Sequence, residues 1–168
     1  TWQLTPEDGK AIAPGRYTLS IAYTGQVHKN GAGLYRAPHK VEGQTRNMLA
    51  TQLEAVFART LFPAFDEPAF RSVFEISVKA TSDFEVHSNM PSRSVQDQGK
   101  ERLHTFLPTP SMPTYLVALT VGQFDTLKGQ SGSIPLRIFT APGKQAQAAY
   151  AMEVTQKVLP FYKAYFGI

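Results

Sequence analysis

The sequence predicts a mainly β protein, an antiparallel sandwich or curved open sheet, with one helix at its C-terminal end. Most of the chain consists of short segments in which apolar and polar residues alternate, with glycine, proline, asparagine or aspartate between them. After Pro142-Gly143 the pattern changes, because glycine is absent from residues 145–166 and apolar residues recur at helical spacing. Short strands of even spacing favour antiparallel sheets over parallel ones.

The first predicted strand covers residues 16–23 and places one set of apolar side chains on a single face. These are Tyr17, Leu19, Ile21 and Tyr23. The glycine-rich, polar stretch from Gly25 to about Asn47 is predicted to be a loop. The further predicted strands are residues 48–54, 73–79, 84–87, 102–107, 115–121 and 134–139. Residues 115–121 are apolar on both faces, which predicts a central strand covered on each side.

The predicted helix over residues 145–166 carries an apolar face. Its members are Ala151, Val154, Val158, Phe161, Tyr162 and Tyr165. Pro160 should kink or break the helix, since it cannot donate a hydrogen bond to the carbonyl of Gln156. With no second helix to pack against, it is expected to lack a partner in the chain and to begin another domain. The expected domains are therefore a β domain at 1–142 and the start of a second domain at 143–168.

Composition excludes several classes of function. The chain has 168 residues, of which 42% are hydrophobic and 18% charged, as is usual for a soluble globular domain. The absence of cysteine excludes a disulfide or a cysteine nucleophile in these residues and is compatible with cytoplasm, periplasm or secretion. No apolar run approaches the roughly 20 residues of a membrane span. The net charge of +4 is dispersed, so nucleic-acid binding is not expected.

The sequence contains no recognisable catalytic or metal-binding motif. The four histidines, His28, His39, His87 and His104, lack the spacing of metal ligands, and none begins an HExxH pair. There is also no GxSxG elbow and no phosphate-binding glycine loop. We therefore expect no catalytic residue and no metal ligand in this chain. Because residue 1 is threonine, we expect the chain to be a piece of a longer protein.

The segment from Arg59 to Phe70 is rich in residues of defined conformational preference. Asp66 or Glu67 before Pro68 fits a helix N-cap with proline at the first helical position. The two carboxylates could instead form an acid/base pair. Adjacent residues on a loop rarely point the same way, so the structural interpretation is favoured, with an ion pair from Arg59 to one carboxylate.

Gln52 and Glu54 form a second candidate site. If residues 48–54 are extended, Gln52 and Glu54 project from the same face as Ala50. The opposite, more apolar face carries Leu49, Thr51 and Leu53. The period alone favours an ordinary solvated strand face over a binding site.

Residues 50–78, ATQLEAVFARTLFPAFDEPAFRSVFEISV, resemble the N-terminal domain of the M1-family zinc aminopeptidases, the aminopeptidase N group. Supporting strings are PGRYTLSIAYTG at 14–25, GLYR at 33–36, SNMP at 88–91, TPSMPTYLVALTVGQF at 109–124 and the closing helix segment up to Ile168. The resemblance covers residues from about 14 to 168 in order. Two departures are Ala64, where many relatives have cysteine, and Pro113, where many have serine.

The resemblance implies a saddle-shaped β domain followed by the start of a thermolysin-like catalytic domain. The family hydrolyses N-terminal residues from peptides, with zinc held by HExxH and a downstream glutamate and a GAMEN loop that holds the substrate amine. This chain carries neither motif and is expected to be inactive alone, with no zinc of its own. Gln52 and Glu54 match the family segment that lines the first side-chain pocket and binds the free amine, whereas Arg59, Asp66, Glu67 and Pro68 match signature residues that we interpret as structural.

Two other functions remain open on the sequence. A non-catalytic relative could keep this domain as a scaffold or interaction protein without HExxH. A free-standing adhesion or sugar-binding sandwich is less favoured, because the strands carry no aromatic platform and the terminal helix would lack a partner. If the chain is a fragment, its unpaired sheet edge and the uncovered helix predict self-association at high concentration.

Overall fold

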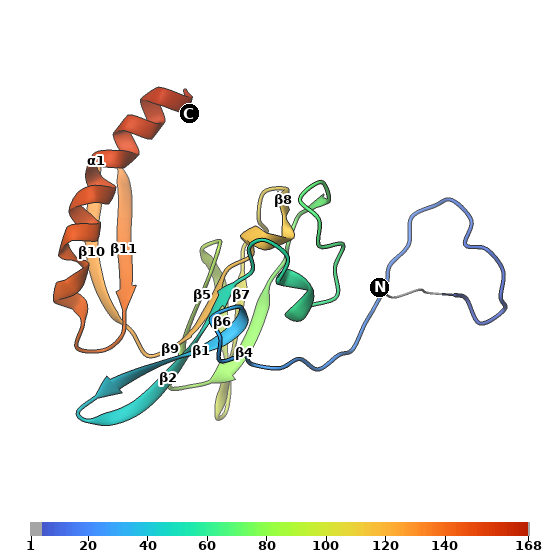
Figure 1. The fold of residues 1–168 in the computed structure, drawn as a ribbon, viewed down its shortest axis with the longest axis horizontal. Helices are drawn as coiled ribbons and strands as arrows, with labels where there is room; N and C mark the ends of the chain where they lie inside the picture. Colours follow the sequence, from blue (N-terminus) through green and yellow to red (C-terminus); the bar gives the residue numbers. More distant parts are fainter. Residues whose placement is uncertain (1–4, 168) are drawn as a thin grey trace.

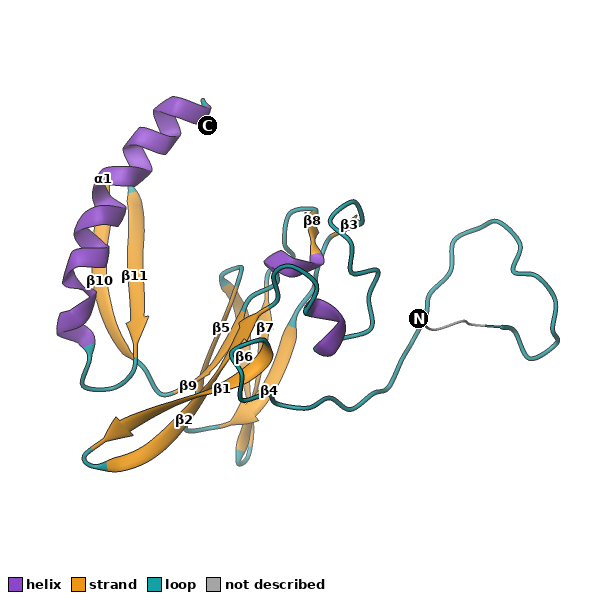
Figure 2. Ribbon diagram, in the orientation of Figure 1, coloured by secondary structure: helices purple, strands orange, loops and turns teal. Residues whose placement is uncertain are grey.

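The computed structural model describes residues 5–167, which form antiparallel sheets and one long C-terminal helix (Figures 1 and 2). The strands are β1 (Gly33–Val41), β2 (Gln44–Gln52), β3 (Arg71–Ser72), β4 (Ser77–Thr81), β5 (Glu85–Ser88), β6 (Ser92–Gln98), β7 (Glu101–Phe106), β8 (Met112–Pro113), β9 (Leu119–Gly122), β10 (Asp125–Ser131) and β11 (Ile134–Thr140). The helices are η1 (Ala58–Thr60), η2 (Thr114–Leu116), η3 (Gln145–Ala148) and α1 (Ala149–Phe166). The predicted mainly β class with one C-terminal helix is confirmed.

Two sheets form the main β unit. One has the order β1-β2-β9-β5 and the other β4-β7-β6, and the strand pairs within both are antiparallel. A core of Val86 from β5, Phe106 from β7 and Val121 from β9 lies between them, which makes the unit a sandwich. The central strand predicted within 115–121 is β9, which pairs with β2 on one side and β5 on the other. The first residues of the predicted strand, Tyr115 and Leu116, instead belong to η2.

The predicted loop at 25–47 is wrong over most of its length. It contains β1 and the first part of β2, which pair in register from Gly33–Gln52 to Val41–Gln44. The two-residue turn is Glu42-Gly43, and both residues have positive φ (48° and 79°), as a tight hairpin requires. The alternation was hidden because both strands are polar toward solvent near this turn, where residues 44–47 are all exposed.

The predicted strand at 16–23 is also wrong. The structure contains neither helix nor strand over residues 5–27, and Figure 1 shows this segment extending away from the sheets. Tyr17, Leu19 and Tyr23 are 66%, 63% and 51% exposed. The apolar alternation is real, but a strand forms only when its N–H and C=O groups find partners, and none of the described strands pairs with this segment.

The C-terminal helix has a partner, contrary to the expectation from the sequence. Helix α1 packs along the β10–β11 hairpin, a strand pair in which β10 was not predicted (Figure 2). Met152 is buried against Gly129, where an added side chain would overlap the methionine sulfur. The Gln156 side chain donates to the Gln130 carbonyl at 2.9 Å. Residues 125–166 therefore form one packed unit of hairpin and helix.

Pro160 bends α1 rather than breaking it, because the helix continues to Phe166 and its axis changes direction along its length (Figure 1). The carbonyl of Gln156, which Pro160 cannot satisfy, accepts a hydrogen bond from Ser131 Oγ at 3.2 Å. The predicted apolar face does not pack inward at this end: Phe161, Tyr162 and Tyr165 are 60%, 48% and 72% exposed. Over the described residues, no helix has both the length and the apolar character needed to cross a membrane.

Candidate functional site

Gln52 and Glu54 lie on either side of Leu53, the largest fully buried side chain among the described residues. Gln52 is the last residue of β2, two residues before the predicted end of that strand, and Glu54 lies in the turn that follows. Between them, Leu53 is 1% exposed and packs in a core with Ala58, Met112 and Val117. Gln52 and Glu54 are both exposed. Leu53 therefore points into this core, while its two neighbours, Gln52 in the strand and Glu54 in the turn, are turned to solvent.

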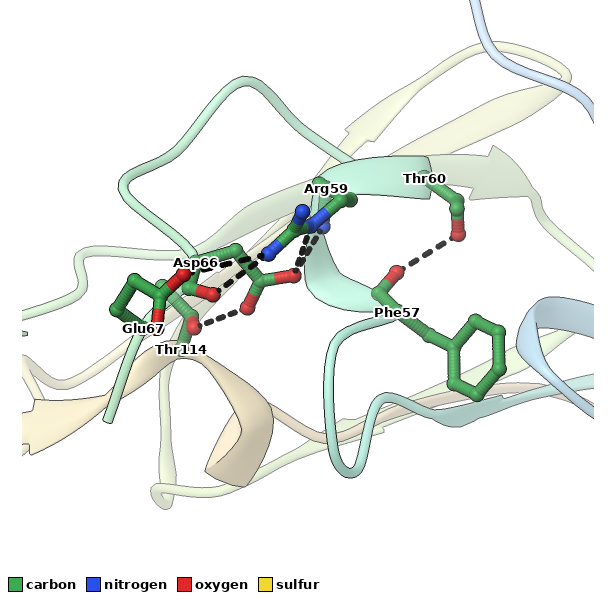
Figure 3. A network of polar contacts seen from close by, with 6 residues as sticks. All are labelled: Phe57, Arg59, Thr60, Asp66, Glu67 and Thr114. Atoms are coloured by element: carbon green, nitrogen blue, oxygen red, sulfur yellow. Dashed lines mark hydrogen bonds and ion pairs between the residues drawn. The ribbon is translucent and has the colours of Figure 1, made fainter. Parts of the chain in front are cut away.

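The chain leaves this segment through a tight helical turn. The Phe57 amide donates to the Leu53 carbonyl at 2.9 Å, and Ala58, the first residue of η1, is fully buried. The Phe57 carbonyl accepts hydrogen bonds from the Thr60 hydroxyl at 2.7 Å and from its amide at 3.1 Å (Figure 3). The backbone on the C-terminal side of Glu54 is thus fixed by local hydrogen bonds and by the burial of Ala58.

A buried carboxylate, that of Asp66, holds the following loop against η1 and η2 (Figure 3). Asp66 Oδ2 accepts hydrogen bonds from the Arg59 amide at 3.0 Å and from Arg59 Nε at 3.1 Å, while Arg59 Nη2 donates to the Asp66 carbonyl at 2.8 Å. Burial raises the pKa of Asp66, but the hydrogen bonds from Thr114 and Arg59 and the Arg59 charge outweigh it, so its pKa lies below the ordinary value.

The predicted ion pair between Arg59 and this segment is confirmed, but the predicted helix N-cap is wrong. Residues 67–69 form a turn, closed by the Phe70 amide on the Glu67 carbonyl, and no helix follows Pro68. The Asp66 side chain is unavailable as a cap because Arg59 and Thr114 occupy it. Glu67 points to solvent and lies 4.0 Å from Arg59 Nη2. One carboxylate is buried and the other exposed, so they do not form an acid/base pair.

Thr114 is the member of this network that the sequence did not single out. Its hydroxyl donates to Asp66 Oδ1 at 2.6 Å, and the residue is 6% exposed. It joins η2 to a loop that lies 48 residues earlier in the chain. The available signal was a lone hydroxyl residue next to the apolar run 115–121, which by itself predicts no partner.

The histidines do not form a metal site in the part of the chain that the structure describes. They lie on different elements, and no group of three or more histidine, aspartate or glutamate side chains is close enough to hold an ion. Burial lowers the pKa of His87, and the charges of Arg137 and His104 act in the same direction against Glu85. Burial, with a smaller contribution from Arg102, lowers the pKa of His104.

These two histidines predict loss of stability in mild acid. Their folded pKa values lie below the unfolded value of about 6.5, so the unfolded chain binds more protons as the pH falls through that region. The free energy of unfolding should therefore be highest above about pH 7 and should fall as the pH drops below about 6.5. Urea titrations between pH 8 and 5 measure this slope. His104→Gln should flatten it relative to the wild type; an unchanged slope in this variant would contradict the assignment.

The chain is similar in sequence to a known peptidase family. The family model of the peptidase M1 N-terminal domain matches residues 4–116. The chain is 38% identical over 160 residues to probable aminopeptidase 2 of Sulfurisphaera tokodaii, covering 94% of this chain and 20% of that protein. It is 36% identical over 159 residues to aminopeptidase N of Acetobacter pasteurianus, covering 94% and 45%. Aminopeptidase M1-A of Oryza sativa subsp. japonica is 37% identical, with 95% and 18% covered.

The chain thus spans between about a fifth and a half of the length of these relatives. The match to the family model includes β1, β2, the Arg59–Asp66 network and most of the main β unit, and the relatives match almost the whole chain at more than a third identity. On these findings, the chain belongs to the M1 peptidase family, and residues 4–116 match the N-terminal domain of that family.

Proposed function

We propose that this chain is part of a zinc-dependent aminopeptidase that removes N-terminal residues from peptides. In that enzyme Gln52 and Glu54 would bind the free amine and the first side chain of the substrate. The observation that carries the assignment is the arrangement around Leu53. A fully buried anchor holds an exposed amide and an exposed carboxylate beside each other at the end of β2.

The chemistry of an exopeptidase explains why such a pair is useful. The enzyme must distinguish a terminal ammonium group from an internal peptide nitrogen, and a carboxylate does so by charge and by hydrogen bonding. A charge-assisted hydrogen bond contributes on the order of 1.5–3 kcal/mol. An amide beside it can donate to a substrate carbonyl or accept from the amine. Neither residue needs to take part in bond cleavage.

Precise placement of the pair favours the same function. The β1–β2 pairing extends to Gln52, opposite Gly33, and the Phe57–Leu53 hydrogen bond closes the turn that contains Glu54. The Arg59–Asp66–Thr114 network then fixes the loop that follows η1. A binding carboxylate held between two fixed points loses little conformational entropy when substrate arrives.

The zinc would be held by residues outside this chain. The described residues offer no set of ligands for it, so Gln52 and Glu54 are assigned to the substrate and not to the metal. The 168 residues alone should therefore release no p-nitroaniline from alanyl or leucyl anilides. The complete gene product should release it, and a chelator should abolish this activity. Turnover by the 168-residue chain, or no turnover by the complete protein, would contradict the proposal; the second outcome would favour a non-catalytic scaffold.

Self-association of the 168-residue chain is a further expectation. Apolar side chains are exposed on segment 16–23 and on the last turns of α1, where Phe161 and Tyr165 stack with ring centroids 5.8 Å apart. Such surfaces associate when nothing covers them. Sedimentation velocity from micromolar to millimolar concentration should show a mass that grows with concentration. A constant monomer mass over that range would contradict this expectation.

A further inference from the structure

A pocket separate from Gln52 and Glu54 opens at the β5 edge of the larger sheet. Its volume is about 510 Å³, and its walls come from β5, the turn at 89–91, β6, β7 and β11. In the order β1-β2-β9-β5, strand β9 separates this edge from β2, which carries Gln52. The pocket therefore lies where the sandwich meets the unit formed by the β10–β11 hairpin and α1.

Basic and titratable side chains dominate the polar part of this pocket. Arg102 and His104 enter from β7, Arg137 from β11 and His87 from β5. The one carboxylate in the lining, that of Glu85, lies 3.3 Å from His87 Nε2. With both imidazoles neutral, the lining carries two guanidinium charges against one carboxylate. Protonation of the imidazoles would add two further positive charges.

The two arginines differ in what they already bind. Arg102 Nε donates to Asp97 Oδ1 at 2.7 Å, so this guanidinium has a carboxylate partner. Among residues 5–167, no carboxylate lies within ion-pair distance of Arg137. The Arg137 guanidinium carbon lies 5.6 Å from the centroid of the Phe139 ring. That contact orients the guanidinium over an aromatic face and leaves its hydrogen-bond donors free.

The imidazoles are fixed in the pocket wall, and their surroundings disfavour protonation. His87 stacks on Phe139 with centroids 3.8 Å apart and meets Phe124 edge-on at 5.5 Å. His104 is 8% exposed and its Nε2 has no hydrogen-bond partner among the described residues, whereas Nε2 of His87 faces the Glu85 carboxylate at 3.3 Å. Burial is the main cause that lowers the pKa of both groups; Glu85 opposes it at His87, and Arg102 adds a smaller effect in the same direction at His104.

We propose that this pocket binds a small oxyanion that carries an apolar group, with Arg137 as its main anchor. The oxyanion satisfies the free guanidinium, and its negative charge lowers the cost of protonating His87 and His104. The apolar group lies against Val95, Phe106 and Phe139, which line the same pocket. The site is independent of the aminopeptidase proposal, because neither Gln52 nor Glu54 contributes to it.

Reciprocal linkage gives the proposal a distinctive signature. If the anion favours protonated imidazoles, it must raise the pKa of His87 and His104, and acidification must tighten its binding by the same free energy. Affinity should therefore rise about three- to tenfold between pH 8 and pH 6. Glu85 competes for His87 and limits this gain, while Arg102 and Arg137 remain charged throughout.

The test uses the 168-residue chain at a concentration where it sediments as a single species. Benzoate and phenyl phosphate are the anionic probes, and benzamide is the neutral isostere of benzoate. Histidine Cε1–H signals followed by NMR from pH 8 to 5 should move to higher pKa values with either anion and stay unchanged with benzamide. A response to phenyl phosphate alone would identify a phosphate-type ligand, and a response to benzoate alone a carboxylate.

Variants of exposed arginines separate the site from general charge effects. Arg137→Gln should weaken benzoate binding at least tenfold, Arg137→Lys should retain part of it, and Arg36→Gln on β1 should bind like the wild type. Circular dichroism checks that each variant is folded. Equal binding of benzamide and benzoate, full binding by Arg137→Gln, or affinity that does not change with pH would each overturn the proposal.

Discussion

Asp66→Ala should lower the free energy of unfolding by about 2–4 kcal/mol, because the change leaves the buried Thr114 hydroxyl and the Arg59 amide without their acceptor. Removing one partner of a fully buried ion pair costs roughly 3–5 kcal/mol. Here the Arg59 side chain is 53% exposed and its charge can return to water, which shifts the expected loss below that of a fully buried pair. Urea unfolding monitored by circular dichroism measures the difference.

Two companion variants separate the buried contact from simple charge. Asp66→Asn keeps an acceptor for Thr114 but removes the charge that Arg59 binds, so its loss should be smaller than that of Asp66→Ala. Glu67→Ala should change the free energy of unfolding by no more than about 0.5 kcal/mol. This side chain is 66% exposed, and its contact with Arg59 is a long ion pair of 4.0 Å. A larger effect at Glu67 than at Asp66 would contradict the assignment of the network.

The Asp66 network also sets behaviour in strong acid. Since the pKa of Asp66 is lowered in the folded chain, its contribution is present above the unfolded value of about 3.8 and is lost as the pH falls below it. The histidine effect lies at higher pH, below about 6.5. The two effects therefore occupy separate parts of a pH titration, and Asp66→Asn should alter only the more acidic one.

The sequence predicted strands well where apolar and polar residues alternate next to a clear turn. The strand at 134–139 is β11 and the strand at 102–107 is β7, each within one residue at either end. The prediction failed where the alternation of apolar and polar residues does not match the actual pairing of strands. Residues 16–23 alternate but pair with none of the described strands, whereas β1 pairs along its whole length with β2 although it contains glycine and proline. Whether a second strand lies beside a segment depends on the tertiary fold, and the local alternation of apolar and polar residues does not show it.

The exposure of Gln52 and Glu54 was predictable from the sequence, but most of the contacts that support this segment were not. Alternation placed Gln52 and Glu54 together opposite Leu53, and both remain exposed beside a buried leucine even though β2 ends at Gln52. The ion pair of Arg59 was predictable because the opposite charges lie seven residues apart. The contact between Thr114 and Asp66 was not, because it joins residues 48 apart and depends on how η2 meets the loop.

Glu54→Ala in the complete gene product should reduce kcat/KM for substrates with a free N-terminal amine by about ten- to two-hundredfold. The reason rests on the proposed function. A carboxylate that faces the substrate ammonium contributes roughly 1.5–3 kcal/mol, and alanine removes it. The loss falls on KM if the ammonium contact is equally strong in the bound substrate and the transition state, and on kcat if it tightens only during the reaction.

The same variant should leave the fold intact, and this separates a binding role from a structural one. Glu54 is exposed, and its side chain accepts none of the hydrogen bonds that fix its turn, which come from the Leu53 and Phe57 backbone. Its melting temperature should therefore stay near the wild-type value, while Asp66→Ala shows a clear decrease. Glu67→Ala, an exposed carboxylate on the next loop, is the matched control and should keep wild-type kcat/KM. If Glu54→Ala also retains near-wild-type efficiency on alanyl and leucyl anilides, Glu54 is an ordinary solvated residue and the amine site lies elsewhere.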